Sequence, residues 1–201
     1  MTIYLKKGQK INLSKEKKGL SKTLVALGWD EVGKNLNFFQ RLFSIGEQDI
    51  DCDASAFLLS EGKLSSGYDD IVYFGNLKHR SGAVYHSGDN LTGAGEGDKE
   101  VINVILDSLP KQYDGVVFVV NIYKAKDRNQ HFGLLKNAYI RIVDVSTNTE
   151  ICRYTLDENY DGKTAMIVAK LTKENGEWQF NAIGDATYDN RISEMADRFR
   201  K

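Results

Sequence analysis

Residues 115–123 read GVVFVVNIY, and most of their side chains are β-branched or aromatic. Within this stretch, VFVVNIY (117–123) is typical of a central strand that is buried on both faces. Eleven further runs of β-forming residues lie before and after it, separated by glycine, asparagine and aspartate. They are TIYL (2–5), KINL (10–13), TLVALGW (23–29), ASAFLL (54–59), DIVYF (70–74), GAVYH (82–86), VINVIL (101–106), AYIRIVDV (138–145), EICRYTL (150–156), TAMIVAKL (164–171) and EWQFNAI (177–183). The pattern predicts an all-β fold, a β-sandwich of two sheets, rather than a sheet built from βαβ units.

Two segments have helical spacing instead. The first, Phe38 to Ile45, is apolar and lies in a loop or helical insertion over residues 34–47. The second covers residues 189–201, where apolar side chains recur at helical spacing behind Asp189, a candidate N-cap. We expect this short C-terminal helix to fold back onto a sheet.

The composition indicates one domain over residues 1–201. A chain of 201 residues can bury a core without disulfides, and it contains one proline and no Ser/Gly-rich linker. Its 27 basic and 28 acidic residues give a net charge of −1. Because no broad electrostatic field of either sign results, we expect no nucleic-acid partner. Any charged surface must come from local clusters of residues.

Cysteine use and hydropathy bear on the location of the protein. Cys52 and Cys152 match no metal-binding spacing, and we interpret them as free thiols in a reducing compartment. No run approaches the ~20 apolar residues that a membrane span needs. We therefore expect a cytoplasmic protein without a transmembrane segment. A further expectation is peripheral contact of this protein with the inner face of the membrane.

Residues 88–100, GDNLTGAGEGDKE, combine glycine with oxygen donors. Glycines let the backbone turn tightly, so that side-chain and carbonyl oxygens can crowd around one point. Carboxylates packed so closely repel one another unless a cation or solvent separates them. The alternative is a solvated acidic loop. The segment predicts a calcium site with the ligands Asp89, Asn90, Glu96, Asp98 and Glu100.

A second acidic group opens the strand predicted at residues 54–59. Alternation along a strand places Asp51 and Asp53 on one face and Cys52 on the other. A pair of this kind alone is more often an edge charge or a turn feature, but together with the glycine loop we expect it to bind metal. Asp30, at the end of another strand, either completes the cluster or begins a turn.

These loops are not EF-hands. Counting twelve positions from Asp51 places Gly62 where the bidentate glutamate belongs. The stretch DENYDG at 157–162 has the opening half of such a loop, but its closing position falls on Val168 inside a strand, and we interpret it as a turn. The site must therefore be assembled from separate loops, around one or two calcium ions.

The segment GDNLTGAGEGDKE resembles the signature of the TerD family of tellurium-resistance and general stress proteins, which is close to GDN-x-TG-x-GEGDDE. Lys99 stands where the family usually has aspartate. Similar stretches cover nearly the whole chain: LGWD (27–30), IDCDASAFLL (50–59), YFGNLKHRSGAVYHSGDN (73–90), VNIYKAKDRNQHFGLLKNAYIRIVD (120–144) and WQFNAIG (178–184). The resemblance implies a calcium-binding β-sandwich linked to resistance against tellurite and other chemical stress, without an established enzymatic activity.

The sequence favours a binding module over an enzyme. His79, His86 and His131 share no metalloprotease spacing, and no nucleophile signature is present. We expect His86 to pack or to hydrogen-bond. The alternative is a divalent-metal-dependent hydrolase or transferase that uses the same carboxylates. As a binding or scaffold module, the protein would have other stress-response proteins as partners, and the Phe38 to Ile45 segment is either a contact surface or core.

Overall fold

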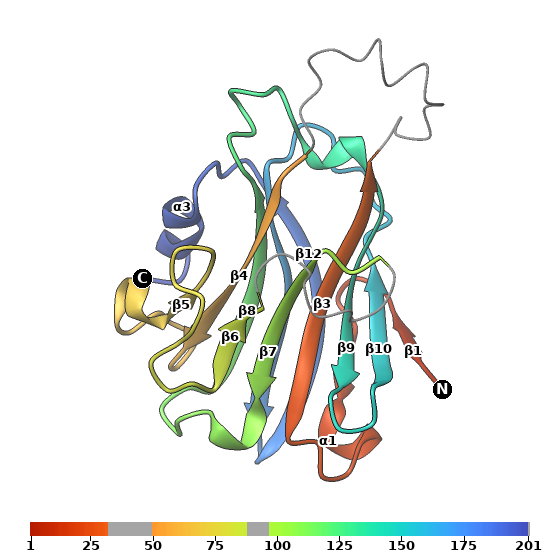
Figure 1. Ribbon diagram of the computed structural model, residues 1–201, viewed down its shortest axis with the longest axis vertical. Coiled ribbons are helices and arrows are strands. Elements are labelled where there is room, and N and C mark those ends of the chain that lie inside the picture. Colours follow the sequence, from red (N-terminus) through yellow and green to blue (C-terminus); the bar gives the residue numbers. More distant parts are fainter. Residues whose placement is uncertain (32–49, 88–96, 201) are drawn as a thin grey trace.

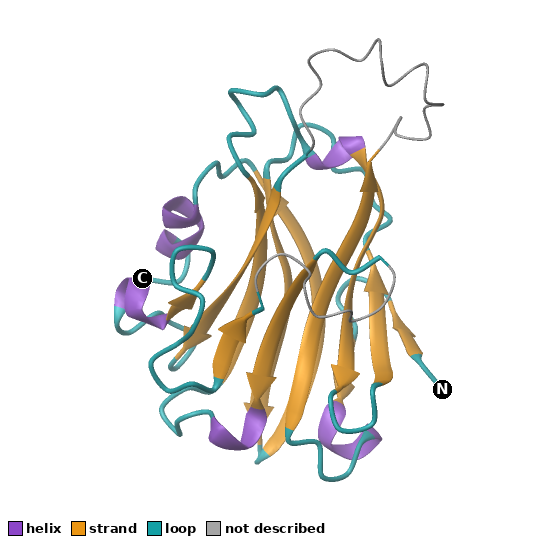
Figure 2. Ribbon diagram, in the orientation of Figure 1, coloured by secondary structure: helices purple, strands orange, loops and turns teal. Residues whose placement is uncertain are grey.

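A computed structural model describes residues 1–31, 50–87 and 97–200, and Figure 1 draws its ribbon. Within these ranges the chain forms two six-stranded sheets that pack face to face, with short helical segments at their ends and on one flank (Figures 1 and 2). The predicted all-β sandwich is confirmed. The insertion at 34–47, with Phe38 to Ile45, lies outside the described residues.

The first sheet has the strand order β1-β10-β9-β3-β7-β6. Its strands are β1 (Ile3–Leu5), β10 (Thr149–Thr155), β9 (Leu135–Asp144), β3 (Lys22–Glu31), β7 (Glu100–Ile105) and β6 (Val84–His86). The second sheet has the order β2-β12-β11-β8-β4-β5. Its strands are β2 (Lys10–Asn12), β12 (Glu177–Thr187), β11 (Ala165–Glu174), β8 (Gly115–Ile122), β4 (Cys52–Leu59) and β5 (Ile71–Val72). Each of the twelve predicted runs overlaps one of these strands.

The helical segments are short. They are α1 (Leu13–Glu16), η1 (Gly67–Asp70), η2 (Leu106–Ser108), η3 (Phe132–Leu134) and α3 (Ile192–Asp197), where η denotes a 3₁₀ turn. Among the described residues, no helix is both long and apolar enough to cross a bilayer. Cys52 and Cys152 are buried free thiols, as the sequence predicts.

Strand β8 is buried along its whole length, as its composition predicts. Alternate side chains serve two cores because α3 covers the outer face of its sheet (Figure 1). Phe118 packs with the inner core between the sheets, whereas Val119 packs outward with Met195 and Ala196 of α3. The predicted return of the C-terminal helix onto a sheet is therefore confirmed.

The predicted N-cap of that helix is wrong. Helix α3 begins at Ile192, and its N-cap position is Arg191, whose side chain makes no capping hydrogen bond. Asp189 instead accepts hydrogen bonds from Arg198 Nε at 2.7 Å and from the Thr187 hydroxyl at 2.7 Å. The backbone is still extended at Arg191, and the helix starts at Ile192.

Several strand ends meet at one end of the sandwich, the upper end in Figure 1. Strand β3 ends there, and β4 begins there beside the end of β8, with Cys52 opposite Ile122. Strand β7 begins at Glu100, which pairs with Leu27 in the upper half of β3. Asp51 and Asp53 therefore lie at this upper end, whereas β7 begins about halfway along β3 (Figure 1).

Candidate metal centre

Asp51 and Asp53 flank the first residue of β4. Cys52 is buried with 3% of its surface exposed, while Asp51 is exposed and Asp53 is half-buried. This is the alternation that the sequence predicts. The carbonyl of Asp51 accepts a hydrogen bond from the Tyr123 amide at 2.8 Å, which ties this end of β4 to the segment after β8.

Carboxylates from both sheets affect the pKa of the Cys52 thiol. Its pKa is raised well above its usual value, first by burial and then by the negative charges of Asp51 and Asp53. Lys99 lowers this pKa and Glu100 raises it, so β7 of the opposite sheet also lies within electrostatic range. Asp51, Asp53 and Glu100 thus all lie within electrostatic range of Cys52, but alternation along β4 places the Asp51 and Asp53 side chains on the opposite face from the Cys52 thiol, which packs in the inner core. The metal site itself stays a prediction.

Glu100 begins β7 and is largely buried. Its Oε2 atom lies 2.7 Å from Nε2 of His86, whose side chain is 5% exposed. The hydrogen-bonding role predicted for His86 is thus the role the structure gives it. Since a carboxylate has two oxygens and about four acceptor sites, this contact leaves Glu100 with capacity for a cation.

Asp98 is held by the first sheet. Its carboxylate is fully buried, accepts a hydrogen bond from the Tyr139 hydroxyl at 2.7 Å, and accepts another from Arg141 Nε at 3.0 Å. Burial, followed by the Asp98 hydrogen bond, raises the pKa of Tyr139 to about 12. Burial alone would lower the pKa of Arg141, but its bonds to Asp98 and Glu150 outweigh burial and raise it. Asp98 thus anchors the end of the glycine loop, and its role as a calcium ligand stays a prediction.

Gly28 gives the same loop room to cross the sheet. A Cβ at this position would collide with the carbonyl oxygen of Gly97 and with the ring of Tyr139. The backbone just before Asp98 therefore lies directly on β3. The glycine of the LGWD stretch is explained by this close approach.

Asp30 contacts the neighbouring strand β9. It is exposed near the end of β3, opposite Lys136 in the register of β9. Its Oδ2 atom accepts a hydrogen bond from Asn137 Nδ2 at 2.8 Å. Of the two roles left open by the sequence, this contact supports a structural one at the strand end.

Three predicted ligands, Asp89, Asn90 and Glu96, lie outside the described residues. Within residues 1–31, 50–87 and 97–200, no group of three or more His, Cys, Asp or Glu side chains is close enough to hold a metal ion. Calcium takes six to eight oxygen ligands. The carboxylates of Asp51, Asp53 and Glu100 have the right chemistry, but a complete site needs donors from the 88–96 segment as well.

Lys99 separates the two carboxylates that end the loop. Its backbone amide donates to the Leu27 carbonyl at 2.8 Å, and its ammonium lies 5.1 Å from the centroid of the Trp29 ring. The side chain is thus drawn toward β3 by a cation–π contact. Its charge still opposes that of the nearby carboxylates at Cys52.

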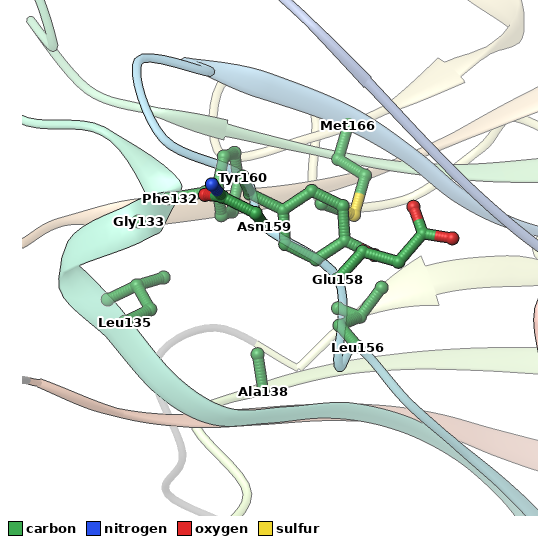
Figure 3. A pocket seen from close by; sticks show the side chains of 9 residues that line it. All are labelled: Phe132, Gly133, Leu135, Ala138, Leu156, Glu158, Asn159, Tyr160 and Met166. Carbon is green, nitrogen blue, oxygen red and sulfur yellow. The ribbon is translucent and has the colours of Figure 1, made fainter.

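A small cavity elsewhere in the sandwich is a weaker candidate site. It has a volume of about 110 Å³ and lies between the start of β9 and the turn at 157–162. Figure 3 shows Leu135, Leu156 and Met166 around it, with Glu158 and Asn159 supplying its polar groups. Glu158 is already paired with Lys7 at 2.9 Å. Ligand pockets usually measure about 300–1,000 Å³, so this cavity is small for a metabolite.

Comparison with known proteins identifies the family. The model of the TerD domain matches residues 1–199. The chain belongs to the TerD family.

The relatives of this TerD-family protein include stress proteins and resistance proteins. The chain is 47% identical over 199 residues to stress response protein SCP2 of Bacillus subtilis (strain 168), covering 99% of this chain and 100% of that one. It is 40% identical over 184 residues to tellurium resistance protein TerD of Serratia marcescens, covering 92% and 90% of the two chains. A homologue of the telluride resistance protein (TerD) from Streptomyces coelicolor A3(2) has a TM-score of 0.60 at 21% identity, covering 87% and 94%. This last likeness shows a shared fold.

Sequence reasoning missed Tyr139 and Arg141, which hold Asp98 in this TerD domain. They are two residues apart on β9, so alternation places both side chains on one face of the sheet. A tyrosine and an arginine on one face of the strand were the available signal. Their partner, Asp98, lies 41 and 43 residues earlier in the chain, and only the strand order β9-β3-β7 reveals it.

Proposed function

We propose that this TerD-family protein is a cytoplasmic calcium-binding module of the stress response that acts by binding other stress-response proteins. The observation that supports it is the pair Asp51 and Asp53 at the start of β4, with Glu100 of the other sheet acting on the same Cys52 thiol. Carboxylates that are brought close together repel one another, and a divalent cation removes that repulsion. The stress and tellurium-resistance names of the relatives support the biological setting.

The ligands would come from three segments. Asp51 and Asp53 would bind from the start of β4, Glu100 from the start of β7, and Asp89, Asn90 and Glu96 from the loop between them. Calcium suits such a set because it accepts six to eight oxygens in flexible geometry, whereas magnesium demands a near-ideal octahedron and retains water. The set has room for one ion or for two ions sharing carboxylates.

Rigid support on one side favours useful affinity. The buried Asp98 carboxylate and Arg141 fix the end of the loop to β9 before any ion binds. A ligand set held in place loses less conformational entropy on binding. With several carboxylates present, we expect a dissociation constant in the ~10⁻⁷ to 10⁻⁵ M range of calcium sensors.

The same neighbourhood supports binding more than catalysis. His86, the histidine beside the carboxylates, is buried against Glu100, and His79 is buried beside Asp70. Neither imidazole is placed to move protons to and from a substrate. We therefore propose a non-enzymatic role for this domain, in which calcium changes the surface that partners read.

Thermal unfolding of metal-stripped protein tests the proposal. Calcium at about 100 times its dissociation constant should add about 2.7 kcal/mol, a rise of roughly 5 to 11 °C in the midpoint. The same concentration of magnesium should add much less. The double variant Asp51→Asn/Asp53→Asn should lose the response.

Asp107→Asn is the matched control, because Asp107 is an exposed aspartate just beyond the opposite end of β7. It should keep the full calcium response. A midpoint that calcium leaves unchanged in the natural protein, or a response that survives in the double variant, would contradict the proposed site.

A further inference from the structure

Four neighbouring strands of the second sheet, β4, β8, β11 and β12, have one end each beside the segment that carries Asp51. The Tyr123 amide bonds to the Asp51 carbonyl at 2.8 Å, which joins the segment after β8 to the start of β4. The Ile122 amide bonds to the Thr164 carbonyl at 3.0 Å, and the Thr164 amide bonds to the Thr187 carbonyl at 3.0 Å. These bonds place the segments around residues 51, 123, 164 and 188 side by side in that order, at the upper end in Figure 1.

Two tyrosines and three cations lie along this edge, and we name them the end strip: Tyr123, Lys124, Arg128, Lys163 and Tyr188. Tyr123 is 39% exposed and Tyr188 is 65% exposed. The Lys124 ammonium and the Arg128 guanidinium lie 5.3 and 5.1 Å from the Tyr123 ring centroid. The Lys163 ammonium lies 3.6 Å from the Tyr188 ring centroid. Each aromatic ring is thus presented to solvent together with a positive charge.

The backbone holds the strip in shape. Lys124 has a φ of 52°, a left-handed conformation that is uncommon for residues other than glycine. The Arg128 amide donates to the Lys124 carbonyl at 3.0 Å, which closes a turn and brings both cations to Tyr123. The Thr164 hydroxyl donates to the Asp189 carbonyl at 2.7 Å, which keeps Tyr188 beside Lys163. The turn after β8 and the hydrogen bond between Thr164 and Asp189 therefore fix the arrangement.

Nearby carboxylates balance the charge of this end. Asp127 lies inside the loop that carries Lys124, Lys126 and Arg128, and Asp161 lies two residues before Lys163 and 3.3 Å from His131. Asp51 and Asp53 adjoin the strip through Tyr123 and Asn121. With the metal centre empty, the acidic groups offset the cations. A divalent ion at Asp51 and Asp53 would leave the same end positively charged.

We propose that the end strip docks the protein on an anionic phospholipid surface, and that calcium at the neighbouring carboxylates switches this docking on. The inference rests on the proposed calcium site and adds the ligand that the calcium-loaded end would bind. Tyrosine rings with adjacent cations suit the headgroup layer, where the amphipathic ring lies at the interface and lysine or arginine meets lipid phosphate.

A nucleic acid fits the strip less well. Base stacking needs an open ring face along a continuous basic groove. Here the Tyr123 ring already makes cation–π contacts with Lys124 and Arg128, and the Tyr188 ring with Lys163. A polyphosphate backbone that followed the strip toward β4 would also run onto Asp51 and Asp53. Lipid headgroups are contacted one at a time, so a mixed row of charges tolerates them better.

Sedimentation with lipid vesicles tests the proposal, with the full chain used throughout. We expect binding to vesicles of phosphatidylcholine mixed with phosphatidylglycerol, a clear increase with calcium, and loss of binding as salt is added, because the attraction is electrostatic. Vesicles of phosphatidylcholine alone should leave the protein in solution. Equal binding to both vesicle types would overturn the proposal.

Charge reversal locates the surface. A cation near an anionic membrane contributes about fivefold in affinity, so Lys124→Glu/Lys163→Glu should lower binding by at least about 25-fold. Lys173→Glu is the matched control, because Lys173 also lies beside an aromatic ring, Trp178, but at the opposite end of β11. Tyr123→Ala/Tyr188→Ala should weaken binding, whereas Tyr4→Ala, at an exposed tyrosine of β1, should not.

Two further measurements separate this inference from the proposed function. If the charge-reversed variant keeps the calcium-dependent rise in melting temperature and loses the vesicles, the inference holds. If natural protein shows that rise but binds no anionic vesicle, the docking surface is wrong and the calcium site stands. Vesicle binding that calcium does not alter would overturn the switch, and binding of a single-stranded oligonucleotide in place of vesicles would overturn the lipid assignment.

Discussion

Asp98 and Asp51 are both predicted ligands of the candidate metal centre, yet their surroundings differ and we expect them to have different roles. Asp98 is buried in an ion pair with Arg141, while Asp51 is exposed at the start of β4. Breaking a buried pair leaves a charge without compensation and costs about 3 kcal/mol or more. We expect Asp98→Asn to lower the stability of calcium-free protein by about that amount, because Arg141 loses its main partner.

Asp51→Asn should have the opposite profile. An exposed carboxylate contributes little to folding, so we expect calcium-free stability to change by less than about 0.5 kcal/mol while the calcium response falls. Urea unfolding of both variants, with and without calcium, makes the comparison. If Asp98→Asn leaves the calcium-free stability intact, the anchoring role assigned to the Asp98–Arg141 pair is wrong.

Lys99 is the residue at which this chain departs from the usual family signature. Its ammonium lies over Trp29, yet it acts on Cys52 against the charges of Asp51 and Asp53. We expect calcium to bind in its presence, and Lys99→Asp to tighten binding by about 1–2 kcal/mol, because a change of two charge units about 10 Å from a divalent ion is worth about that much at the dielectric constant of water. Calorimetric titration with calcium measures both proteins. Binding seen in Lys99→Asp alone would show that Lys99 disables the site.

At the scale of elements, the turn between β9 and β10 depends on one carboxylate. Asp144 accepts hydrogen bonds from the Ser146 amide at 2.9 Å and the Thr147 hydroxyl at 2.7 Å, and it pairs with Lys17 of the segment after α1 at 3.1 Å. Burial alone would raise the pKa of Asp144, but these partners outweigh it and lower the pKa below its usual value. The unfolded chain therefore binds the proton more readily than the folded chain.

The lowered pKa of Asp144 makes the folded protein less stable in acid. The stability that Asp144 contributes is present above the unfolded pKa of about 4 and is lost as the pH falls through the folded value. We expect Asp144→Asn to cost about 2 kcal/mol near neutral pH and to make the loss of stability in acid smaller. Urea unfolding between about pH 7 and pH 3 measures both effects. An equal acid loss in the two proteins would assign the acid sensitivity to other groups.

The elements also show what the sequence can and cannot predict. Short β-branched runs such as 115–123 identify all twelve strands because local composition and alternation are written in consecutive residues. Strand order is not local: β1 pairs with β10, and β3 inserts between β9 and β7. For the same reason the pair of Asp51 and Asp53 was predictable, whereas Arg141 as the partner of Asp98 needed the register of three strands.

At the scale of the whole molecule, the proposed ligands come from two sheets that share no strand. Asp51 and Asp53 lie at the start of β4 in the second sheet, and Glu100 begins β7 in the first. An ion bound by both sets would be a bridge between the sheets. Calcium should then stabilise both strand starts together, because opening either one would remove ligands from the ion.

Amide hydrogen exchange measures this coupling. The Tyr123 amide, bonded to Asp51, and the Lys99 amide, bonded to Leu27, report on the second and first sheets respectively. With calcium in excess at about 100 times its dissociation constant, both should slow by up to about 100-fold, since the bound ion adds about 2.7 kcal/mol to any opening that releases it. Amides at the opposite end, such as that of Lys173, should keep their rates unless they exchange by global unfolding. Slowing confined to one sheet would mean that calcium is held by that sheet alone.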